Sequence, residues 1–266
     1  MPLPLPANDG PEQWKALMQK SVDLLTNTDA NQAKLLFIKR REVQEFDGDG
    51  KVKTRKVITT AREPYEDAVV TRVIARDDKP ITEEERAQQE ENIRRTVAEW
   101  RAREQAQAAV GPKKPTEKAN ETNRMIREFA NALDYKPVGM ETIDGRPARI
   151  FDFQPRPGYK PPSMKYRIFE KMRGKVWIDQ ESAEVVRVDA EMFEDLNVGF
   201  GVVGHVGKGS TFKMERRRMA GIWVPVREQI RIQARLMLVK SFRQEILNTF
   251  SEFKPRPGKT EAALVQ

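Results

Sequence analysis

The sequence predicts an α+β protein that is mainly antiparallel β, with one broad sheet and helices packed on its apolar face. Residues 174–253 read as consecutive long strands joined by turns, without helices between them, which is the pattern of an antiparallel meander. Two of these strands begin with a glycine shortly before a tryptophan, in Gly174–Asp179 and Gly221–Pro225. Since such a sheet must have at least one face covered, amphipathic helices elsewhere in the chain are the expected cover.

The N-terminal part of the chain predicts one helix followed by three strands. Pro11 suits the first turn of a helix, and apolar residues then recur at helical spacing: Trp14, Leu17, Met18, Val22 and Leu25. The glycine-containing segment Asp47–Lys51 predicts a hairpin loop between the first two strands. The predicted strands are Lys34–Phe46, Val52–Thr60 and Tyr65–Ala75.

Two further helices are predicted in the middle of the chain. Thr82 and Glu85 form a capping box that opens a charged helix reaching about Gln107. Its apolar residues form one narrow stripe: Ile93, Val97 and Trp100. Such a stripe indicates a surface helix that contacts the rest of the protein along a single seam. A linker is predicted at about 108–119, and the following helix, Glu121–Leu133, is clearly amphipathic.

The domain prediction is one unit over residues 11–253, with the charged helix at about 82–107 as an insertion. Residues 1–10 are predicted as a flexible N-terminus and residues 254–266 as a flexible tail. Within the unit, strands resume after the second helix around a turn at Asp144-Gly145, and Ser163–Met172 is predicted as a short helix.

Apolar and charged residues alternate along the predicted C-terminal strands. Positions 186, 188, 190 and 192 are apolar whereas 187, 189 and 191 are charged, and similar alternation holds in 212–215 and in most of 224–236. The charged face is expected to pair opposite charges across strands. The apolar face is either a plain core under helices or, in part, a cavity for an acyl chain. On the second interpretation the ligand-binding residues are Val188, Met192, Phe212, Met214, Ile230 and Ile232.

The residue types that most enzymatic and metal sites need are scarce. With no cysteine and one histidine, His205, neither a disulfide, a His–Cys metal site nor a Cys–His nucleophile can form. Glycines in 199–204 match G-x-G-x-x-G, but a strand rather than a helix is predicted next, so the segment is interpreted as a flexible loop. Glu45–Gly50 imitates the start of an EF-hand loop, but its twelfth position is Lys56. The prediction is a protein that is not an enzyme, with no catalytic residue, metal or cofactor.

The net charge of +8, from 48 Lys and Arg against 40 Asp and Glu, predicts a mixed surface with a basic excess. The mean hydropathy of −0.70 is that of a polar chain. Attraction to anionic lipid or nucleic acid is the alternative interpretation. No basic run exceeds three residues, the length of Arg216–Arg218, and the aromatic residues fall mainly on the apolar side of the alternation. A nucleic-acid surface would instead interleave aromatic and basic residues.

Several segments carry a resemblance that spans most of the chain: Arg40–Val52, Pro64–Glu66, Arg76–Ile81, Gly145–Ala148, Phe153–Tyr159, Met172–Asp179, Lys208–Ser210, Gly221–Pro225 and Phe250–Lys254. In these segments the chain resembles uncharacterised members of the LolA-like superfamily, the group of the bacterial outer-membrane lipoprotein carrier. The resemblance implies a half-barrel, in which helices form a lid over the concave apolar face of a curved antiparallel sheet. It also implies a periplasmic carrier or sensor of lipidated or hydrophobic ligands, without catalysis.

Three functions therefore stay open from the sequence. The first is a periplasmic or cell-envelope carrier of a hydrophobic or lipidated ligand, with the expected signal peptide removed before Pro2. The second is an envelope sensor or protein-interaction module whose core is filled. The third and minor one is a binder of anionic surfaces or nucleic acid. The partners expected are the hydrophobic ligand and either a membrane surface or an envelope protein, with no nucleic acid.

Overall fold

The computed structural model describes residues 10–26, 35–66, 68–108, 117–198, 204–219, 221–236 and 240–256. The helices within these ranges are α1 (Pro11–Leu25), α3 (Glu83–Ala108), α4 (Glu117–Ala132) and the short 3-10 helix η1 (Met164–Lys171). The first strands are β1 (Leu35–Phe46), β2 (Val52–Tyr65), β3 (Ala68–Arg76), β4 (Lys79–Pro80), β5 (Leu133–Ile143) and β6 (Arg146–Pro155). The later strands are β7 (Met172–Asp179), β8 (Val185–Met192), β9 (Leu196–Val198), β10 (Gly204–Val206), β11 (Thr211–Met219), β12 (Ile222–Leu236) and β13 (Lys240–Pro255).

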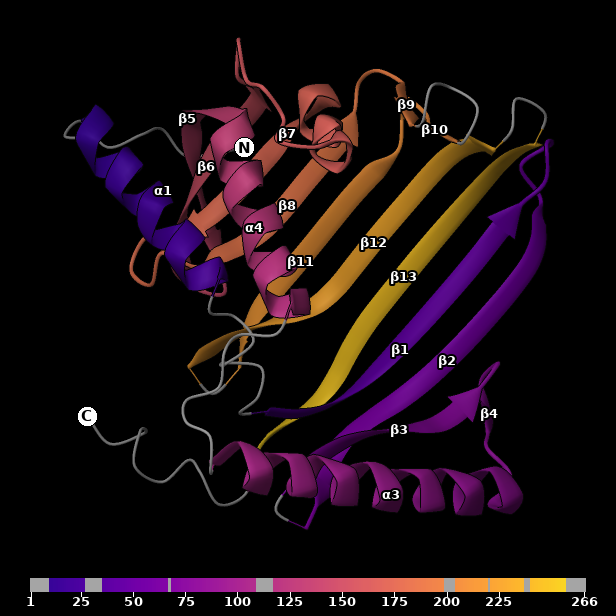
Figure 1. The fold of residues 1–266 in the computed structure, drawn as a ribbon. Coiled ribbons are helices and arrows are strands. Elements are labelled where there is room, and N and C mark those ends of the chain that lie inside the picture. The colour runs from indigo at the N-terminus through magenta and orange to yellow at the C-terminus, as the bar shows by residue number, and fades with distance from the viewer. Residues whose placement is uncertain are drawn as a thin grey trace.

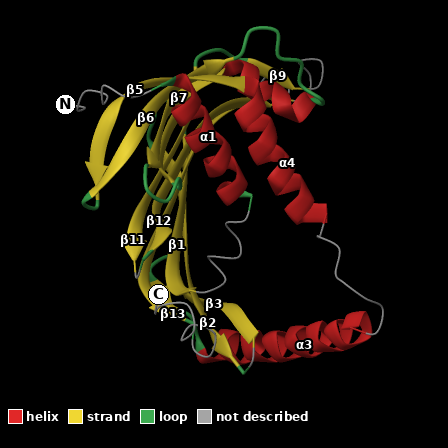
Figure 2. Ribbon diagram, turned by 90° about the vertical axis from the view of Figure 1, so that its left-hand side faces the viewer, coloured by secondary structure: helices red, strands yellow, loops and turns green. Residues whose placement is uncertain are grey.

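The described strands form one antiparallel sheet of 13, whose main path runs β4-β3-β2-β1-β13-β12-β11-β8-β7-β6-β5. The sheet is open and curved, and α1 and α4 lie on its concave side, as Figure 1 and Figure 2 show. The N-terminal strands β1 to β3 join the C-terminal strands through the β1–β13 pair. The predicted fold class is confirmed: a mainly antiparallel α+β protein with a curved half-barrel sheet and helices on its concave face.

Most of the predicted elements are confirmed, with differences at some ends. The capping box forms, because the Glu85 amide donates to Thr82 Oγ1 and the Thr82 amide donates to the Glu85 carboxylate. However, α4 begins at Glu117, inside the predicted linker, and β13 continues to Pro255, beyond the predicted end of the domain. Residues 204–206, predicted as loop, form strand β10, so the backbone of His205 is extended. Residues 199–203 and most of the predicted flexible termini lie outside the described residues.

The main core lies between the concave face of β5 to β11 and the helices α1, α4 and η1. From the sheet it contains Phe151 and Phe153, which are buried together with Val176, Ile178 and Ala190. Phe129 of α4 stacks edge-on against Phe153 and against Phe169 of η1, each with 5.5 Å between ring centroids. Such edge-to-face pairs add about 0.5–1.5 kcal/mol beyond the burial of their area.

Gly174 of β7 makes room for this core. A Cβ atom at this position would lie 2.9 Å from the ring of Phe153 and 2.0 Å from the carbonyl oxygen of Asp189. Any larger residue would therefore push apart β6, β7 and β8, where the aromatic core packs. The close approach of the two neighbouring strands explains why the sequence has glycine near the start of β7, although the strand itself begins at Met172.

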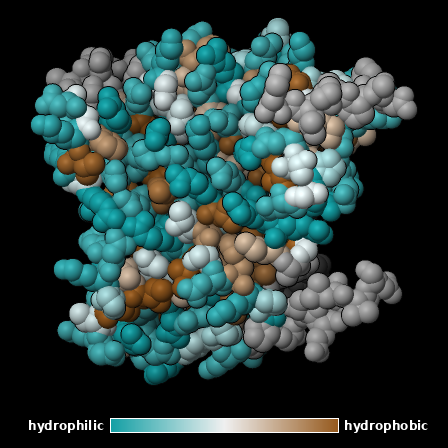
Figure 3. Space-filling model, turned by 180° about the vertical axis from the view of Figure 1, so that it is seen from behind, coloured by the Kyte–Doolittle hydropathy of each residue, from teal (hydrophilic) through white to brown (hydrophobic). Residues whose placement is uncertain are grey.

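The convex face of the sheet pairs its charges across neighbouring strands, as the alternation predicted. Cross-strand ion pairs join Arg173 to Glu191 at 2.7 Å, Lys213 to Asp189 at 2.8 Å and Arg231 to Glu245 at 2.9 Å. Figure 3 views this side and shows a mainly hydrophilic surface with smaller apolar patches. The convex face therefore needs no covering layer.

A second apolar cluster lies on the convex side and contains both tryptophans of the strand starts. Trp177 and Trp223 are buried together with Ile143, Ala148, Ile150 and Val186. The sequence pattern placed Val186 on the same face as Val188, which is wrong, because a register shift between β7 and β8 moves Val186 into this cluster. The Trp177 indole donates to Glu141 at 2.7 Å, and Arg187 lies 5.0 Å from the Trp177 ring.

Because Trp223 is only 2% exposed, we expect Trp223→Ala to lower the free energy of unfolding by roughly 3–5 kcal/mol through lost contacts and a cavity. The matched control is Trp100→Ala, since Trp100 of α3 is 41% exposed. Urea unfolding followed by circular dichroism measures both. Equal losses in the two variants would contradict a packing role for Trp223.

The turn between β7 and β8 depends on Asp179, whose side chain is buried. Its carboxylate accepts two hydrogen bonds from Arg146, at 2.7 and 2.9 Å, and two from the amide and hydroxyl of Ser182. Burial raises the pKa of Asp179, but these donors outweigh burial and lower the pKa to about 2. The ionised carboxylate is thus the form that the folded protein stabilises.

Acid should therefore remove part of the stability through Asp179. Because the folded-state pKa lies below the ordinary value of about 3.9, this contribution is complete above that value and is lost as the pH falls toward about 2. We expect Asp179→Asn to be clearly less stable than wild type at pH 7, and the difference to shrink at pH 3 and below. Urea titrations at several pH values measure it, and a difference that stays constant with pH would refute this role.

Candidate ligand-binding surface

The structure separates the six predicted ligand-binding residues into two groups. Val188, Phe212 and Met214 pack against the main core beneath α1 and α4, and Met192 is only 4% exposed. Ile230 and Ile232 of β12 are half-buried and lie outside that core cluster. The protein's own helices thus occupy part of the predicted ligand face, while β12 lies beyond them (Figure 1).

An apolar row crosses the concave face from the helix-covered core onto the neighbouring strands. The strand register pairs Phe212 with Ile230, Ile230 with Ile246, and Ile246 with Val43. Directly paired residues of antiparallel strands share a face, so these four side chains lie on the concave side of β11, β12, β13 and β1. The row begins at Phe212 in the core and leaves the cover of the helices. Sequence alternation found its first two members, but Ile246 and Val43 join it only through strand pairing.

A polar row runs beside the apolar row. The register pairs Glu228 with Met214 and Asn248, and Asn248 with Arg41. The Asn248 side chain is buried; its amide donates to Glu228 at 3.0 Å, and its oxygen accepts from Arg41 at 3.5 Å. Arg41 itself is exposed, so the concave face opens to solvent toward β1 and β2. This row places hydrogen-bonding groups next to the apolar row.

Beyond the polar row lies an aromatic cluster made by Phe37, Phe250 and Phe253. The ring of Phe37 is 5.7 Å from that of Phe250 and 5.9 Å from that of Phe253. Lys39 lies 5.2 Å from the Phe250 ring, and the Arg62 guanidinium lies 5.9 Å from the Phe37 ring. Phe250 follows Asn248 by two residues on β13, so it points to the same concave face. The concave face thus carries two apolar zones, one aliphatic and one aromatic, with cations beside the second.

The helix α3 closes the edge of the sheet at β3. The side-chain amide of Gln89 accepts from the Val73 amide at 2.7 Å and donates to the Val73 carbonyl at 3.0 Å, as a neighbouring strand would. Ion pairs to the sheet, Arg72–Glu90 and Arg101–Glu66, flank this contact along the helix. The prediction of a surface helix touching along one seam is confirmed, and its position protects an edge that could otherwise pair with another chain.

We expect Gln89→Ala to speed hydrogen exchange at the Val73 amide, because that amide loses its acceptor and the helix contact weakens by about 0.5–1.5 kcal/mol. Gln88→Ala is the matched control, since Gln88 is the exposed neighbour on the same helix. Exchange measured by NMR or mass spectrometry compares the variants. If Val73 exchanges at the same rate in both, the edge contact does not exist in solution.

Within the described residues, no three or more His, Cys, Asp or Glu side chains are grouped so that they could bind a metal ion. The EF-hand-like segment is a hairpin tip, where the Asp47 carboxylate accepts from the amides of Asp49 and Lys51. The described helices include none with the length and apolar character needed to cross a bilayer.

No protein family and no curated protein matches the chain. Among solved structures, a putative outer-membrane lipoprotein-sorting protein domain from Vibrio parahaemolyticus is similar at 10% identity and a TM-score of 0.35, over 93% of this chain and 97% of the other. A DUF1329 family protein from Desulfovibrio piger is similar at 11% identity and a TM-score of 0.29, over 94% and 96%. A LolA superfamily protein from Nitrosomonas europaea is similar at 9% identity and a TM-score of 0.28, over 91% and 93%.

One of these three solved structures bears the name of the LolA superfamily, the group that the sequence resembles. None of these three TM-scores exceeds 0.35, so the similarity carries no ligand, partner or activity over to this chain.

Proposed function

We propose that the protein is a non-enzymatic binding protein of the periplasm or cell envelope that holds a hydrophobic or lipidated ligand on the concave face of its sheet. The observation that supports this function best is the apolar row of Phe212, Ile230, Ile246 and Val43. This row extends the apolar surface of the core past the helices. There an apolar ligand chain can cover it and remove it from water. The envelope location rests on the sequence resemblance alone.

The neighbouring polar row fits a ligand with a polar group beside its apolar chain. The exposed Arg41, held beside the buried Asn248, offers a guanidinium next to the apolar row with hydrogen-bonding capacity beyond the bond that the structure shows. An acyl chain attached through an ester or amide carries acceptors at that position. The ligand's chain would lie along Ile230 and Ile246, with its polar linkage toward Arg41.

A second candidate function is an envelope sensor or protein-interaction module without a lipid cavity. It is favoured by one observation: Val188, Phe212 and Met214, predicted as ligand-binding residues, pack against the core beneath α1 and α4. A module of this kind would bind no lipophilic probe, which separates the two functions.

If an acyl chain lies on the apolar row, a fluorescent fatty-acid probe should bind, and Ile230→Asp should abolish binding because it places an unpaired charge there. The matched control is Gln233→Asp, which introduces the same side chain at an exposed position on the opposite face of β12. Circular dichroism checks the fold of each variant, and probe titrations give the dissociation constants.

If Ile230→Asp does not fold, Ile230→Trp tests whether the probe binds on the apolar row. It fills space on the apolar row without adding charge, at a cost that is typically about 1–3 kcal/mol of stability, and should weaken the probe. The proposal fails if the wild-type protein binds no lipophilic probe, or if Ile230→Trp folds and binds the probe with unchanged affinity. Either result leaves the interaction module as the better account.

A further inference from the structure

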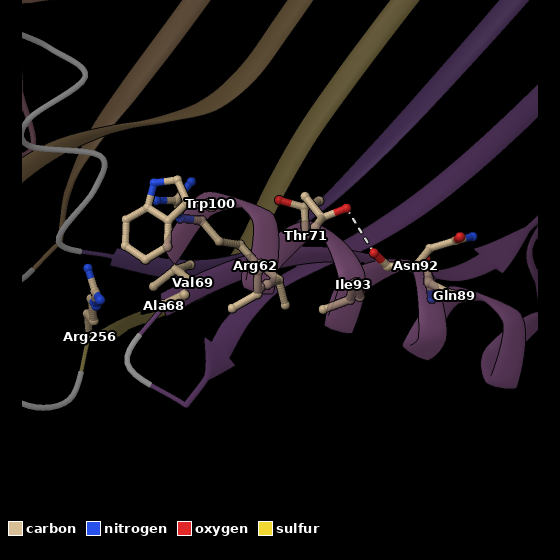
Figure 4. A pocket seen from close by; sticks show the side chains of 12 residues that line it. Arg62, Ala68, Val69, Thr71, Gln89, Asn92, Ile93, Trp100 and Arg256 are labelled. Atoms are coloured by element: carbon tan, nitrogen blue, oxygen red, sulfur yellow. Dashed lines mark hydrogen bonds between the residues drawn. The ribbon is translucent and has the colours of Figure 1, made fainter. Parts of the chain in front are cut away.

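A groove separate from the apolar row lies between β3 and α3. Its volume is about 920 Å³, within the range usual for small-molecule sites. The apolar seam of α3, made by Ile93, Val97 and Trp100, forms one wall, and Val69 of β3 lies on the other. Figure 4 shows Val69, Ile93 and Trp100 directed into the groove, with Gln89 and Asn92 toward its other end. Trp100 is one of the more exposed large apolar side chains of the described chain.

Two guanidinium groups give the groove a positive end. Arg62 and Arg256 both line it, and Figure 4 places Arg256 near Trp100, with the Arg62 side chain running toward the same end. Burial lowers the pKa of Arg62, and the positive charge of Arg256 lowers it further, so the two charges lie close together in a partly desolvated place. No acidic side chain is among the described residues that line the groove.

Most donors of Arg62 stay available to a ligand. Its Nε–H donates to the Leu35 carbonyl at 3.2 Å, which fixes the direction of the guanidinium, and the group lies over the ring of Phe37. Among the described residues no carboxylate lies within ion-pair distance of Arg62. The two terminal nitrogens present four N–H groups, the arrangement that binds a carboxylate or phosphate by paired hydrogen bonds.

The guanidinium of Arg62, which keeps most of its donors in a partly apolar groove, is complementary to an anion. The remaining walls of the groove are apolar and would pack against an apolar chain. They are formed by Val69, Ile93, Val97 and Trp100. We propose that this groove binds a single-chain anionic amphiphile, with its carboxylate or phosphate on Arg62 and Arg256 and its chain against the α3 seam. This site is independent of the proposed ligand on the apolar row.

Dodecyl phosphate, dodecanoate, dodecyl maltoside and inorganic phosphate, each titrated calorimetrically below any micelle-forming concentration, test the site. We expect dodecyl phosphate or dodecanoate to bind, and Arg62→Gln to weaken that binding about ten-fold or more while dodecyl maltoside is unaffected. Trp100→Ala should weaken every ligand that carries a dodecyl chain. Arg103→Gln is the matched control, since this exposed arginine of α3 pairs with Glu99 and does not line the groove.

The variants also separate this site from the apolar row. Ile230→Trp should leave the binding of the anionic amphiphile unchanged, so that loss of binding in this variant but not in Arg62→Gln would place the ligand on the sheet and overturn the groove. Inorganic phosphate that binds as tightly as dodecyl phosphate would overturn the apolar half of the proposal. Binding only to vesicles of anionic phospholipid, with no binding of the monomeric amphiphiles, would overturn it in favour of a membrane-docking surface.

Discussion

The sheet is wider than its covering helices are long, and the rest of the structure depends on this difference. The main path has eleven strands, which at about 4.8 Å per strand spacing is nearly 50 Å across. The covering helices α1 and α4 have 15 and 16 residues, or about 24 Å each at 1.5 Å per residue. Two such helices can cover only part of the concave face, and they cover the part built by β5 to β11. The apolar row lies on the part of the concave face that these two helices do not cover.

On the convex face, long charged side chains rather than helices cover the apolar surface. Val57 of β2 is buried on the convex side, and none of the described helices lies over that side. Arg40, Arg55, Glu42 and Asp78 form ion pairs around it, with distances of 2.8 to 2.9 Å. Hydrogen bonds from Arg55 in particular lower the pKa of Glu42 to about 2, against the opposing effect of burial. The long stems of these side chains cover apolar surface while their charged ends stay in water. Side chains therefore cover this part of the convex face in place of a helix.

The sequence predicted the elements well because their signals are local. Period-2 alternation, the capping box of Thr82 and Glu85 and the amphipathic stripe of the second helix each depend on residues close together in the chain. Register and partner choice are not local. A shift of one residue between β7 and β8 moved Val186 to the other face, and the pairing of β1 with β13, which completes the apolar row, joins segments about two hundred residues apart. Arg216 is another case: it is buried and donates to the carbonyls of Val185 and Trp223, so it is not part of a basic surface stripe.

The two faces of the sheet also differ in how they handle charge, and this difference bears on the ligand. On the convex face, cations are largely neutralised by carboxylates on adjacent strands. On the concave side, among the described residues, Lys39 contacts an aromatic ring, Arg41 contacts an amide and Arg62 contacts a backbone carbonyl and an aromatic ring, and none of the three has a carboxylate within ion-pair distance. Cations that frame an apolar surface without paired carboxylates favour anions that bring apolar groups with them. The curvature that leaves the face partly uncovered and the placement of these cations both fit the kind of ligand that we propose, one that is apolar along its length and negative at one end.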